Sequence, residues 1–385
     1  MPERVAIVGG GIVGIAHAWR EAVRGAEVTL FERGQRAEGA SVRNFGMVWP
    51  IGQPMATREA ALQSRSLWTE FLRETGVWSH SEGSIHLATR HDELAVLEEF
   101  AEKAPTLGYD CRLLSADEAR AACPAAGAPV IGGLFSPTEI GVDPREVIAT
   151  APAWLAERFG VKLEYGVTVQ EVDLPVVTTN EGRHLAFDRV TIASGADFAT
   201  LYPEVFVEHS LARCKLQMMR TVPQPEGWRM GPMVASGLTL RHYDSFAICD
   251  NLPALRDRIA EETPELDRYG IHVMAAQNGL SEVVLGDSHE YGDAITPFDR
   301  QEITRLMLRE LRSLIDLPTW ELAAQWHGVY AVQANGEPQF VHTPAEGVRI
   351  VIATGGCGMT MSFGLAEQAA QRHLDASANL TGAPA

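Results

Sequence analysis

The sequence predicts a mixed α/β (α+β) protein in which a parallel sheet, assembled from discontinuous segments, is joined to a second, antiparallel sheet. Short apolar runs that end in glycine turns occur at the start, the middle and the end of the chain: RVAIVGGG, RVTIASGAD and VRIVIATGGCG. Such runs are typical of buried parallel strands. Residues 211–250 instead alternate apolar and polar side chains, as half-buried antiparallel strands do.

Length and composition set the first limits on function. The 385 residues suffice for two or three domains. Hydrophobic residues make up 46% of the chain and charged residues 21%, which excludes wholesale disorder. A net charge of −18 without a Lys/Arg-rich run argues against nucleic-acid and membrane partners, so we expect small-molecule partners. Oligomeric state stays open.

The cysteines and the absence of long apolar runs predict a cytoplasmic location and no metal. The five cysteines are scattered, form no CxxC pair and lie in no His/Cys cluster at metal spacing, so we expect reduced thiols. No apolar run approaches the 18 residues that a membrane span needs. The first predicted strand begins at Arg4, which leaves no room for a signal peptide.

The first 35 residues contain the most informative motif. A strand at 4–8 is followed by Gly9, Gly11 and Gly14 in G-x-G-x-x-G spacing, then by a helix, and by a second strand that ends at Glu32. The first glycine permits a tight turn, the second lets backbone N–H groups approach a pyrophosphate, and the third lets the helix pack closely on the strand. Glu32 is placed to accept hydrogen bonds from ribose hydroxyls. The segment predicts a Rossmann-like dinucleotide site.

The segment that follows favours flavin over nicotinamide. A nicotinamide dehydrogenase usually continues with further βαβ units. Here residues 39–54 form a loop rich in glycine and proline, whose backbone can lie along a flat ring system. A nicotinamide-linked dehydrogenase or a non-catalytic flavoprotein that shares only the opening motif remains an alternative.

These motifs resemble the D-amino-acid oxidase/glycine oxidase/sarcosine oxidase (DAO) family of FAD-dependent oxidoreductases over essentially the whole length. Besides the N-terminal motif, the resemblance rests on Gly141–Arg145, on residues 160–169 and 190–196, and on the terminal Gly355–Thr360. It implies non-covalent FAD in an extended pose, with Gly9–Gly14 at the pyrophosphate and Val169 near the adenine. Gly355–Thr360 would lie at the ribityl chain and the ring carbonyl, and residues 43–48 along the isoalloxazine.

The residues that the resemblance implies for cofactor binding come from six parts of the chain. They are Gly9, Gly11, Ile12, Val13, Gly14, Glu32, Arg33, Ser41, Arg43, Asn44, Phe45, Gly46, Met47, Val48, Val169, Ala193, Ser194, Gly195, Gly355, Gly356, Gly358, Met359 and Thr360.

Several stretches are similar to a bacterial subgroup associated with aminophosphonate catabolism: SVRNFGMVWPIGQP, CKLQMMRT, LTLRHYDSF, RYGIHVMAAQNG and LGDSHEYGD. This resemblance implies oxidation of a small anionic amine of the 2-aminoethylphosphonate type, possibly N-methylated or 1-hydroxylated. A hydride would pass to flavin N5, the imine would hydrolyse to an aldehyde, and O2 or another acceptor would reoxidise the flavin, O2 giving H2O2. The alternatives are oxidation of glycine, sarcosine or a D-amino acid, or of a 2-hydroxy acid.

The predicted division places residues 1–79, 143–210 and 326–385 in the FAD-binding domain and residues 80–142 and 211–325 in the substrate-binding domain. An anionic substrate requires cations or hydrogen-bond donors in the cleft. The candidates for substrate binding are Arg43, Lys215, Gln217, Arg241, His242 and Tyr330. The aminophosphonate interpretation therefore requires a small basic pocket, which we expect around Arg241 and Lys215, and it is the first to fail if that pocket is absent.

Two further expectations concern individual side chains. Reading 238–243 as a strand puts Arg241 and Tyr243 on one face and His242 on the other. No residue is certain as a catalyst, because the flavin performs the redox step. His327 and Tyr330 are the catalytic candidates, and a hydroxy-acid oxidase would need His327 or His242 as a base. Each of these histidines has a structural, hydrogen-bonded role as its alternative.

Overall fold

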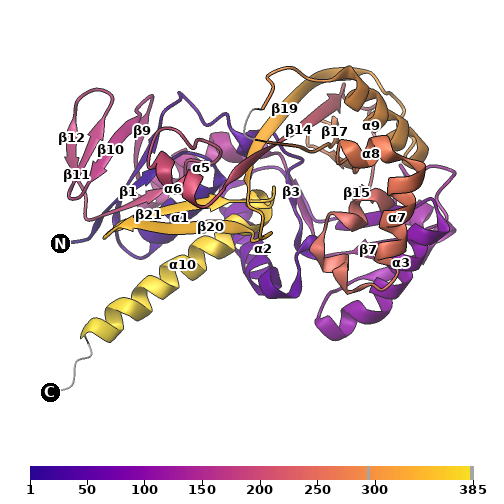
Figure 1. Cartoon of the computed structure of the whole chain (residues 1–385), viewed down its shortest axis with the longest axis horizontal. Coiled ribbons are helices and arrows are strands. Elements are labelled where there is room, and N and C mark those ends of the chain that lie inside the picture. The colour runs from indigo at the N-terminus through magenta and orange to yellow at the C-terminus, as the bar shows by residue number, and fades with distance from the viewer. Residues whose placement is uncertain (293–294, 382–385) are drawn as a thin grey trace.

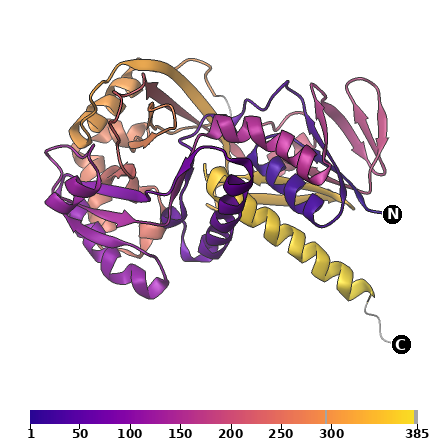
Figure 2. The ribbon, with the colours of Figure 1, turned by 180° about the vertical axis from the view of Figure 1, so that it is seen from behind.

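The computed structural model describes residues 1–292 and 295–381, and the side chains up to residue 371. Two sheets of different kinds lie side by side, as Figure 1 shows, and Figure 2 gives the reverse view. The parallel sheet contains the first strand (β1, Arg4–Val8) and the last strand (β21, Val348–Ala353) of the chain, and the antiparallel sheet is built from segments between them. The mixed α/β prediction, with one sheet of each kind, is confirmed.

The parallel sheet is assembled from segments far apart in sequence. Its order is β20 (Gln339–Ala345), β21 (Val348–Ala353), β13 (Arg189–Ile192), β1 (Arg4–Val8), β2 (Glu27–Glu32) and β9 (Lys162–Tyr165), and only β20 runs antiparallel. β1 pairs with β2 and β13 through nearly all its residues. The carboxyl ends of β1, β2, β13 and β21 therefore meet at one edge, where α/β proteins bind nucleotides.

Helices cover one face of this sheet and a small sheet covers the other. The helices are α1 (Ile12–Val23), α2 (Met55–Thr75), α5 (Pro144–Phe159) and α10 (Gly358–Thr381). Their aromatic side chains meet edge to face: Trp19 lies 5.0 Å from Trp154 and 5.2 Å from Phe363. The opposite face of the parallel sheet is covered by a three-stranded sheet of β10 (Val169–Asp173), β11 (Val176–Thr179) and β12 (His184–Ala186). Val169, Val177 and Phe187 pack against the parallel sheet there.

The other half of the molecule contains the antiparallel sheet. Its order is β18 (Glu290–Gly292), β14 (Ala212–Thr221), β17 (Val283–Gly286), β16 (Met274–Gln277), β15 (Met233–Ser236), β5 (Ser84–Ala88), β7 (Gly132–Ser136) and β6 (Arg112–Ser115). In this sheet, β15 and β5 are the one pair of described strands that run parallel. The long strand β19 (Leu322–Val332) pairs with β14. A short three-stranded sheet of β3 (Met47–Val48), β8 (Ile140–Val142) and β4 (Ser79–His80) lies between the two parts.

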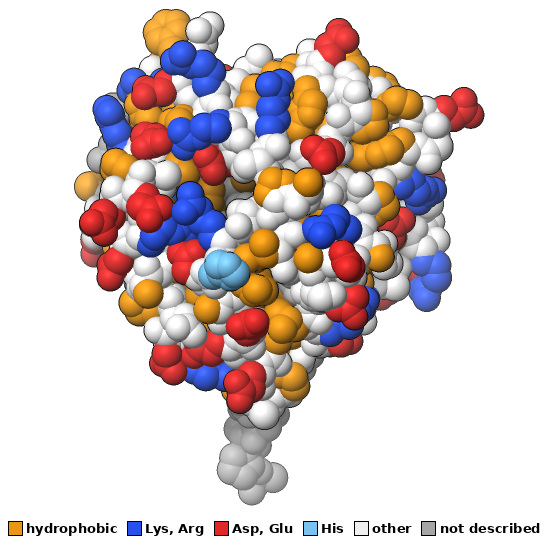
Figure 3. Space-filling model, turned by 90° about the vertical axis from the view of Figure 1, so that its right-hand side faces the viewer, with side chains coloured by type: hydrophobic (Ala, Val, Ile, Leu, Met, Phe, Trp, Pro, Cys, Tyr) orange, Lys and Arg blue, Asp and Glu red, His pale blue; other side chains and the backbone are white. Residues whose placement is uncertain are grey.

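Helices pack on the antiparallel sheet through one large apolar core. They are α3 (His91–Lys103), α4 (Ala116–Ala122), α7 (Leu252–Glu262), α8 (Pro264–Arg268) and α9 (Gln301–Leu314). Val96, Leu255 and Met307 are fully buried in this core. Figure 3 shows acidic and basic side chains interspersed over the outer face of this half of the molecule. The short helix α6 (Pro203–Glu208) packs instead on the parallel sheet.

One local prediction is wrong, and one boundary stays a prediction. Residues 237–241 form a 3₁₀ helix rather than a strand, so the strand alternation expected for Arg241, His242 and Tyr243 does not apply. The proposed domain boundary at residue 326 falls inside β19, all of which lies in the antiparallel sheet. The division itself remains a prediction. Among the described residues, no helix is long and apolar enough to cross a membrane.

Candidate active site

A cavity of about 1150 Å³ lies where the two halves meet. On one side it is lined by residues at the carboxyl ends of β1, β2, β13 and β21. On the other side it is lined by residues of β14, β16 and β19 and of the loops beside them. We call the first side, together with Gly14 packed beneath it, the glycine wall and define it by residues 8–14, 193–197 and 353–358.

The glycines of the N-terminal motif have roles that no larger residue can fill. Gly9 has φ +113°, and a Cβ placed there would lie 2.3 Å from the carbonyl oxygen of Ala193. A Cβ at Gly14 would lie 1.8 Å from the carbonyl oxygen of Gly9, so α1 can approach β1 only through glycine. The N-terminus of α1 therefore faces the cavity at close range, where its dipole favours an anionic group such as a pyrophosphate.

Glu32 ties two backbone turns together at the edge of the glycine wall. Its carboxylate accepts hydrogen bonds from Gly10 N (2.8 Å) and Gly34 N (2.9 Å). A carboxylate offers about four lone-pair sites, so acceptor capacity remains for ribose hydroxyls. Its neighbour Arg33 forms an ion pair with Asp197 at 2.6 Å.

The loop after β2 is held in place by its own polar side chains. Arg43 donates from Nε to Glu38 O (2.8 Å) and from a guanidinium nitrogen to His327 O (3.1 Å). Asn44 donates to two backbone oxygens, those of Ala40 and Ser41, and accepts from Gly46 N. Arg43 therefore braces the loop while it lines the cavity.

The C-terminal glycine turn closes the glycine wall. Gly355 and Gly356 both adopt positive φ (+64° and +73°), and α10 begins two residues later. Burial raises the pKa of the Cys357 thiol to about 12, and the thiol donates to the carbonyl oxygens of Thr354 and Pro338. A protonated thiol is a poor nucleophile, which supports non-covalent cofactor binding.

Most residues predicted to hold the cofactor line this one cavity. They are Gly9, Gly11, Ile12, Val13, Glu32, Arg33, Ser41, Arg43, Asn44, Phe45, Met47, Val169, Ala193, Ser194, Gly195, Gly355, Gly356, Gly358, Met359 and Thr360. Gly14, Gly46 and Val48 do not line it. Gly14 packs on Gly9, Gly46 packs against Val142 O, and Val48 is fully buried in the core beneath.

Three histidines line the opposite side of the cavity and come from three separate segments. His242 follows the 3₁₀ helix, His272 precedes β16, and His289 follows β17. The ring centroids of His242 and His272 lie 4.0 Å apart, and those of His272 and His289 lie 4.9 Å apart. One nitrogen from each lies within 4.8 Å of the others, close enough for all three to contact one group. We call these residues, with Asp287, the histidine wall.

The hydrogen bonds of the histidine wall leave nitrogen atoms available. His289 Nδ1 lies 3.0 Å from Gly270 O, so it must carry the proton, and Nε2 then carries a lone pair. His272 Nε2 lies 3.2 Å from Asp287 Oδ1. His272 Nδ1 and His242 Nε2 are buried and have no hydrogen-bond partner among the described residues. An unpartnered buried polar atom is uncommon and indicates a missing ligand or water.

The histidine wall is uncharged near neutral pH. Burial lowers the pKa of all three imidazoles, and the positive charge of Arg241 lowers each further. Burial raises the pKa of Asp287 to about 8, so its carboxyl group is protonated at pH 7. Burial also raises the pKa of Tyr330, which lines the same cavity.

The predicted basic pocket around Arg241 and Lys215 is not present. Arg241 forms an ion pair with Asp267 and donates to Ile271 O (3.0 Å), and it does not line the cavity. Lys215 is 1% exposed and its ammonium group contacts Thr296 O (3.0 Å), Phe298 O and Asp299 (2.8 Å). Both cations already have partners within the protein, so neither is placed to take an anionic ligand.

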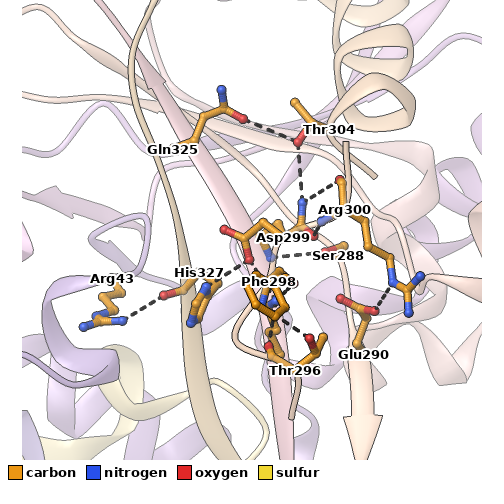
Figure 4. Close-up of polar contacts among 12 residues, drawn as sticks. Arg43, Ser288, Glu290, Thr296, Phe298, Asp299, Arg300, Thr304, Gln325 and His327 are labelled. Carbon is orange, nitrogen blue, oxygen red and sulfur yellow. Dashed lines mark hydrogen bonds and ion pairs between the residues drawn. The ribbon is translucent and has the colours of Figure 1, made fainter. Parts of the chain in front are cut away.

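Two further candidates belong to the same polar network beside the cavity, drawn in Figure 4. Gln217 exchanges hydrogen bonds with the backbone of Arg300, donating to its oxygen (3.1 Å) and accepting from its nitrogen (2.7 Å). His327 Nδ1 lies 2.9 Å from Asp299. Neither side chain lines the cavity, whereas the predicted His242 and Tyr330 do. The network holds residues 296–300 against β14.

His272, Asp287, His289 and Tyr291 are not among the site residues predicted from the sequence. The signal that points to them is the set of distinctive stretches noted above. LTLRHYDSF, RYGIHVMAAQNG and LGDSHEYGD each contribute one histidine, and the last also contributes Asp287 and Tyr291. These residues are far apart along the chain, so no local spacing reveals that they meet.

Comparison with known proteins agrees with the geometry of the glycine wall. The model of the family described as FAD dependent oxidoreductase (DAO) matches residues 4–372. Glycine oxidase of Geobacillus kaustophilus is 32% identical over 212 residues, covering 51% of this chain and 55% of that protein. The bifunctional protein ThiO/ThiG of Nostoc sp. is 26% identical over 240 residues, covering 58% of this chain and 36% of that protein. The chain thus matches only part of the length of these relatives.

Solved structures share the fold over nearly the full length. The crystal structure of glycine oxidase from G. kaustophilus has a TM-score of 0.74 at 22% identity and covers 96% of this chain and 95% of its own. L-proline dehydrogenase from P. horikoshii has a TM-score of 0.76 at 22% identity, covering 98% and 95%. The FAD-bound L-α-glycerophosphate oxidase of Mycoplasma pneumoniae has a TM-score of 0.72 at 15% identity, covering 97% and 95%. These likenesses establish the fold.

Proposed function

The chain belongs to the DAO family of FAD-dependent oxidoreductases, and from this premise we propose that it oxidises a small anionic amine of the 2-aminoethylphosphonate type. N-methylated or 1-hydroxylated forms of this amine belong to the same class. Because the basic pocket expected around Arg241 and Lys215 is absent, the proposal depends on the histidine wall, which brings buried, unpartnered nitrogen atoms to the side of the cavity opposite the glycine wall.

The glycine wall fits FAD. Gly9 and Gly14 leave room for a pyrophosphate at the N-terminus of α1, Glu32 retains acceptor capacity for a ribose, and Gly355–Gly356 expose backbone beside the cavity. When bound, FAD accepts a hydride from the substrate and passes the electrons to O2 or another acceptor. The remaining parts of the reaction depend on the residues of this chain.

The histidine wall suits an amine that must react in its neutral form. The three imidazoles and Asp287 are uncharged near pH 7, so this wall offers no ion pair to a substrate ammonium group. The wall therefore favours a substrate whose amine is neutral, and its buried nitrogen atoms, such as His242 Nε2, are left to form hydrogen bonds with other polar groups of the substrate.

Oxidation of an amino acid is the second candidate, and the resemblance to glycine oxidase favours it. Glycine, sarcosine and D-amino acids carry a carboxylate in place of the phosphonate. Oxidation of a 2-hydroxy acid would require a base near the reacting hydroxyl. Of the two candidates for that base, His242 lines the cavity and His327 does not.

A substrate screen tests the proposal. Purified holoenzyme is incubated with 2-aminoethylphosphonate and its N-methyl and 1-hydroxy derivatives, with glycine, sarcosine and D-amino acids, and with 2-hydroxy acids. Peroxide and reduction of an artificial dye are measured in parallel, so an oxidase and a dehydrogenase both register. We expect the aminophosphonates to give the highest kcat/KM. Turnover of amino acids or hydroxy acids alone would contradict the aminophosphonate assignment.

A further inference from the structure

We propose that His242, His272 and His289, together with Asp287, form the subsite that binds the anionic group of the substrate, and that this group is bound together with a proton. The inference rests on the proposed function in one respect, namely that the substrate carries a phosphonate or a carboxylate. Both are oxyanions with the same hydrogen-bonding needs.

The cations of the cavity have other partners. The arginines that line it pair with acidic side chains or donate to backbone oxygens: Arg33 with Asp197, Arg36 with Glu38, Arg43 with Glu38 O and His327 O, and Arg213 with Ala196 O. Lys215 and Arg241 do not reach the cavity. Among the described residues, the histidine wall therefore holds the groups best placed to receive an oxyanion.

The wall supplies donors and one acceptor. His272 Nδ1 and His242 Nε2 are buried and unpartnered, and Asp287 adds a carboxyl proton while it is neutral. His289 Nε2 carries a lone pair, because Nδ1 donates to Gly270 O. A lone pair facing an oxyanion repels it unless a proton lies between them. Binding therefore requires that His289 take up a proton or that the ligand arrive as its conjugate acid.

The charges around the wall favour an anion over a metal cation. The guanidinium of Arg241 is 8% exposed and acts on all three imidazoles, and Arg256 adds to its effect at His242. Asp267, which pairs with Arg241 and is half exposed, partly offsets the positive charge of Arg241. The hydroxyls of Tyr243, Tyr291 and Tyr330 lie nearby with raised pKa, and are neutral. Asp244, also on the cavity, is exposed.

Asp287 sets the pH range of binding. Below its pKa of about 8 the carboxyl group is neutral and donates a proton to a ligand or to His272. Above that pH it becomes a buried carboxylate beside the anion and repels it. Anion affinity should therefore be highest below pH 8 and fall as the pH rises through about 8. Asn at position 287 keeps a neutral donor and cannot ionise.

The test uses holoenzyme and two amine-free anions, methylphosphonate and acetate, so that no turnover is needed. Isothermal titration calorimetry gives Kd at pH 7 and pH 9, and repeating the pH 7 titration in two buffers of different ionisation enthalpy counts the protons taken up. Acetate keeps its charge between pH 7 and 9, so any change in its Kd reports on the protein.

We expect proton uptake at pH 7 and a Kd at least tenfold weaker at pH 9. His272→Asn should weaken binding at pH 7 at least tenfold, and Asp287→Asn should lose less affinity than the wild type between pH 7 and pH 9, with the remaining loss due to the proton that His289 takes up. His209→Asn, a change at an exposed histidine away from the cavity, is the matched control and should change nothing. The tighter of the two anions identifies the substrate class as phosphonate or carboxylate.

Binding that is independent of pH in the wild type, or unaffected by His272→Asn, would overturn the proposal. So would stoichiometric zinc in the purified protein whose removal by a chelator abolishes anion binding, since the histidines would then be metal ligands. If His272→Asn folds poorly, the pH dependence of Kd in the wild type still tests the proposal, because that measurement needs no variant. If the anions bind as described but no amine is oxidised, the proposed function is contradicted and the proposed anion subsite is still supported.

Discussion

The glycine wall and the histidine wall face the same cavity and are built in opposite ways. The glycine wall uses backbone at turns that admit no side chain, because a Cβ at Gly9 or Gly14 would overlap a carbonyl oxygen. The histidine wall uses side chains whose nitrogen atoms are left without partners. Backbone recognition requires close approach and tolerates no substitution, whereas side-chain recognition can change with a few residues. The first suits a cofactor shared by a family, and the second suits a particular substrate.

The largest effect should follow from filling the glycine wall. Gly14→Val places a branched side chain where a Cβ already lies 1.8 Å from Gly9 O, so α1 must move away from β1. We expect FAD content to fall more than tenfold, measured as the ratio of absorbance at 450 nm to that at 280 nm. Gly39→Ala is the control, because Gly39 also lines the cavity but has open space around it. Full FAD content in Gly14→Val would show that the wall is not the cofactor site.

A smaller loss of FAD should follow from Glu32→Gln. The amide keeps one acceptor for the N–H groups of Gly10 and Gly34 but loses the charge. Hydrogen bonds to charged groups contribute about 1.5–3 kcal/mol, so we expect the FAD dissociation constant to rise about tenfold. Titration of apoprotein with FAD, followed by flavin fluorescence, measures it. An unchanged constant would mean that Glu32 serves only the turns.

Lys215→Met should affect stability without affecting the histidine wall. The buried ammonium group holds the backbone oxygens of Thr296 and Phe298, and its loss leaves them without that donor. We expect a loss of about 2 kcal/mol and a fall in Tm of about 5 °C, measured by thermal unfolding. Lys162→Met, at an exposed site, is the control. If Lys215→Met instead abolished anion binding at unchanged Tm, Lys215 would be a substrate ligand after all.

The smallest effect should come from His327→Ala. Its ring pairs with Asp299 and does not line the cavity, although the sequence made it a catalytic candidate. We expect kcat/KM for the best substrate to stay within about threefold of wild type. A hundredfold loss at unchanged FAD content would restore His327 as a base and favour the hydroxy-acid reaction.

The two walls also differ in what the sequence reveals. Gly9, Gly11, Gly14 and Glu32 lie within 24 residues, so their spacing shows the turn, the helix and the second strand directly. His242, His272 and His289 meet only through the pairing of distant strands, which leaves no spacing to detect. The sequence predicts Arg241 as a ligand of the anionic group because arginine commonly binds oxyanions. In the structure Arg241 lies in a 3₁₀ helix and forms an ion pair with Asp267 instead.

The most direct test of the difference between the walls is anaerobic reduction of bound flavin by 2-aminoethylphosphonate at pH 7, comparing wild type with His272→Asn. Stopped-flow absorbance at 450 nm separates the limiting rate of reduction from the substrate dissociation constant. We predict that both proteins keep FAD, that the limiting rates agree within about threefold, and that the dissociation constant rises at least tenfold in His272→Asn. Loss of FAD in the variant, or equal dissociation constants, would contradict the assignment of the two walls.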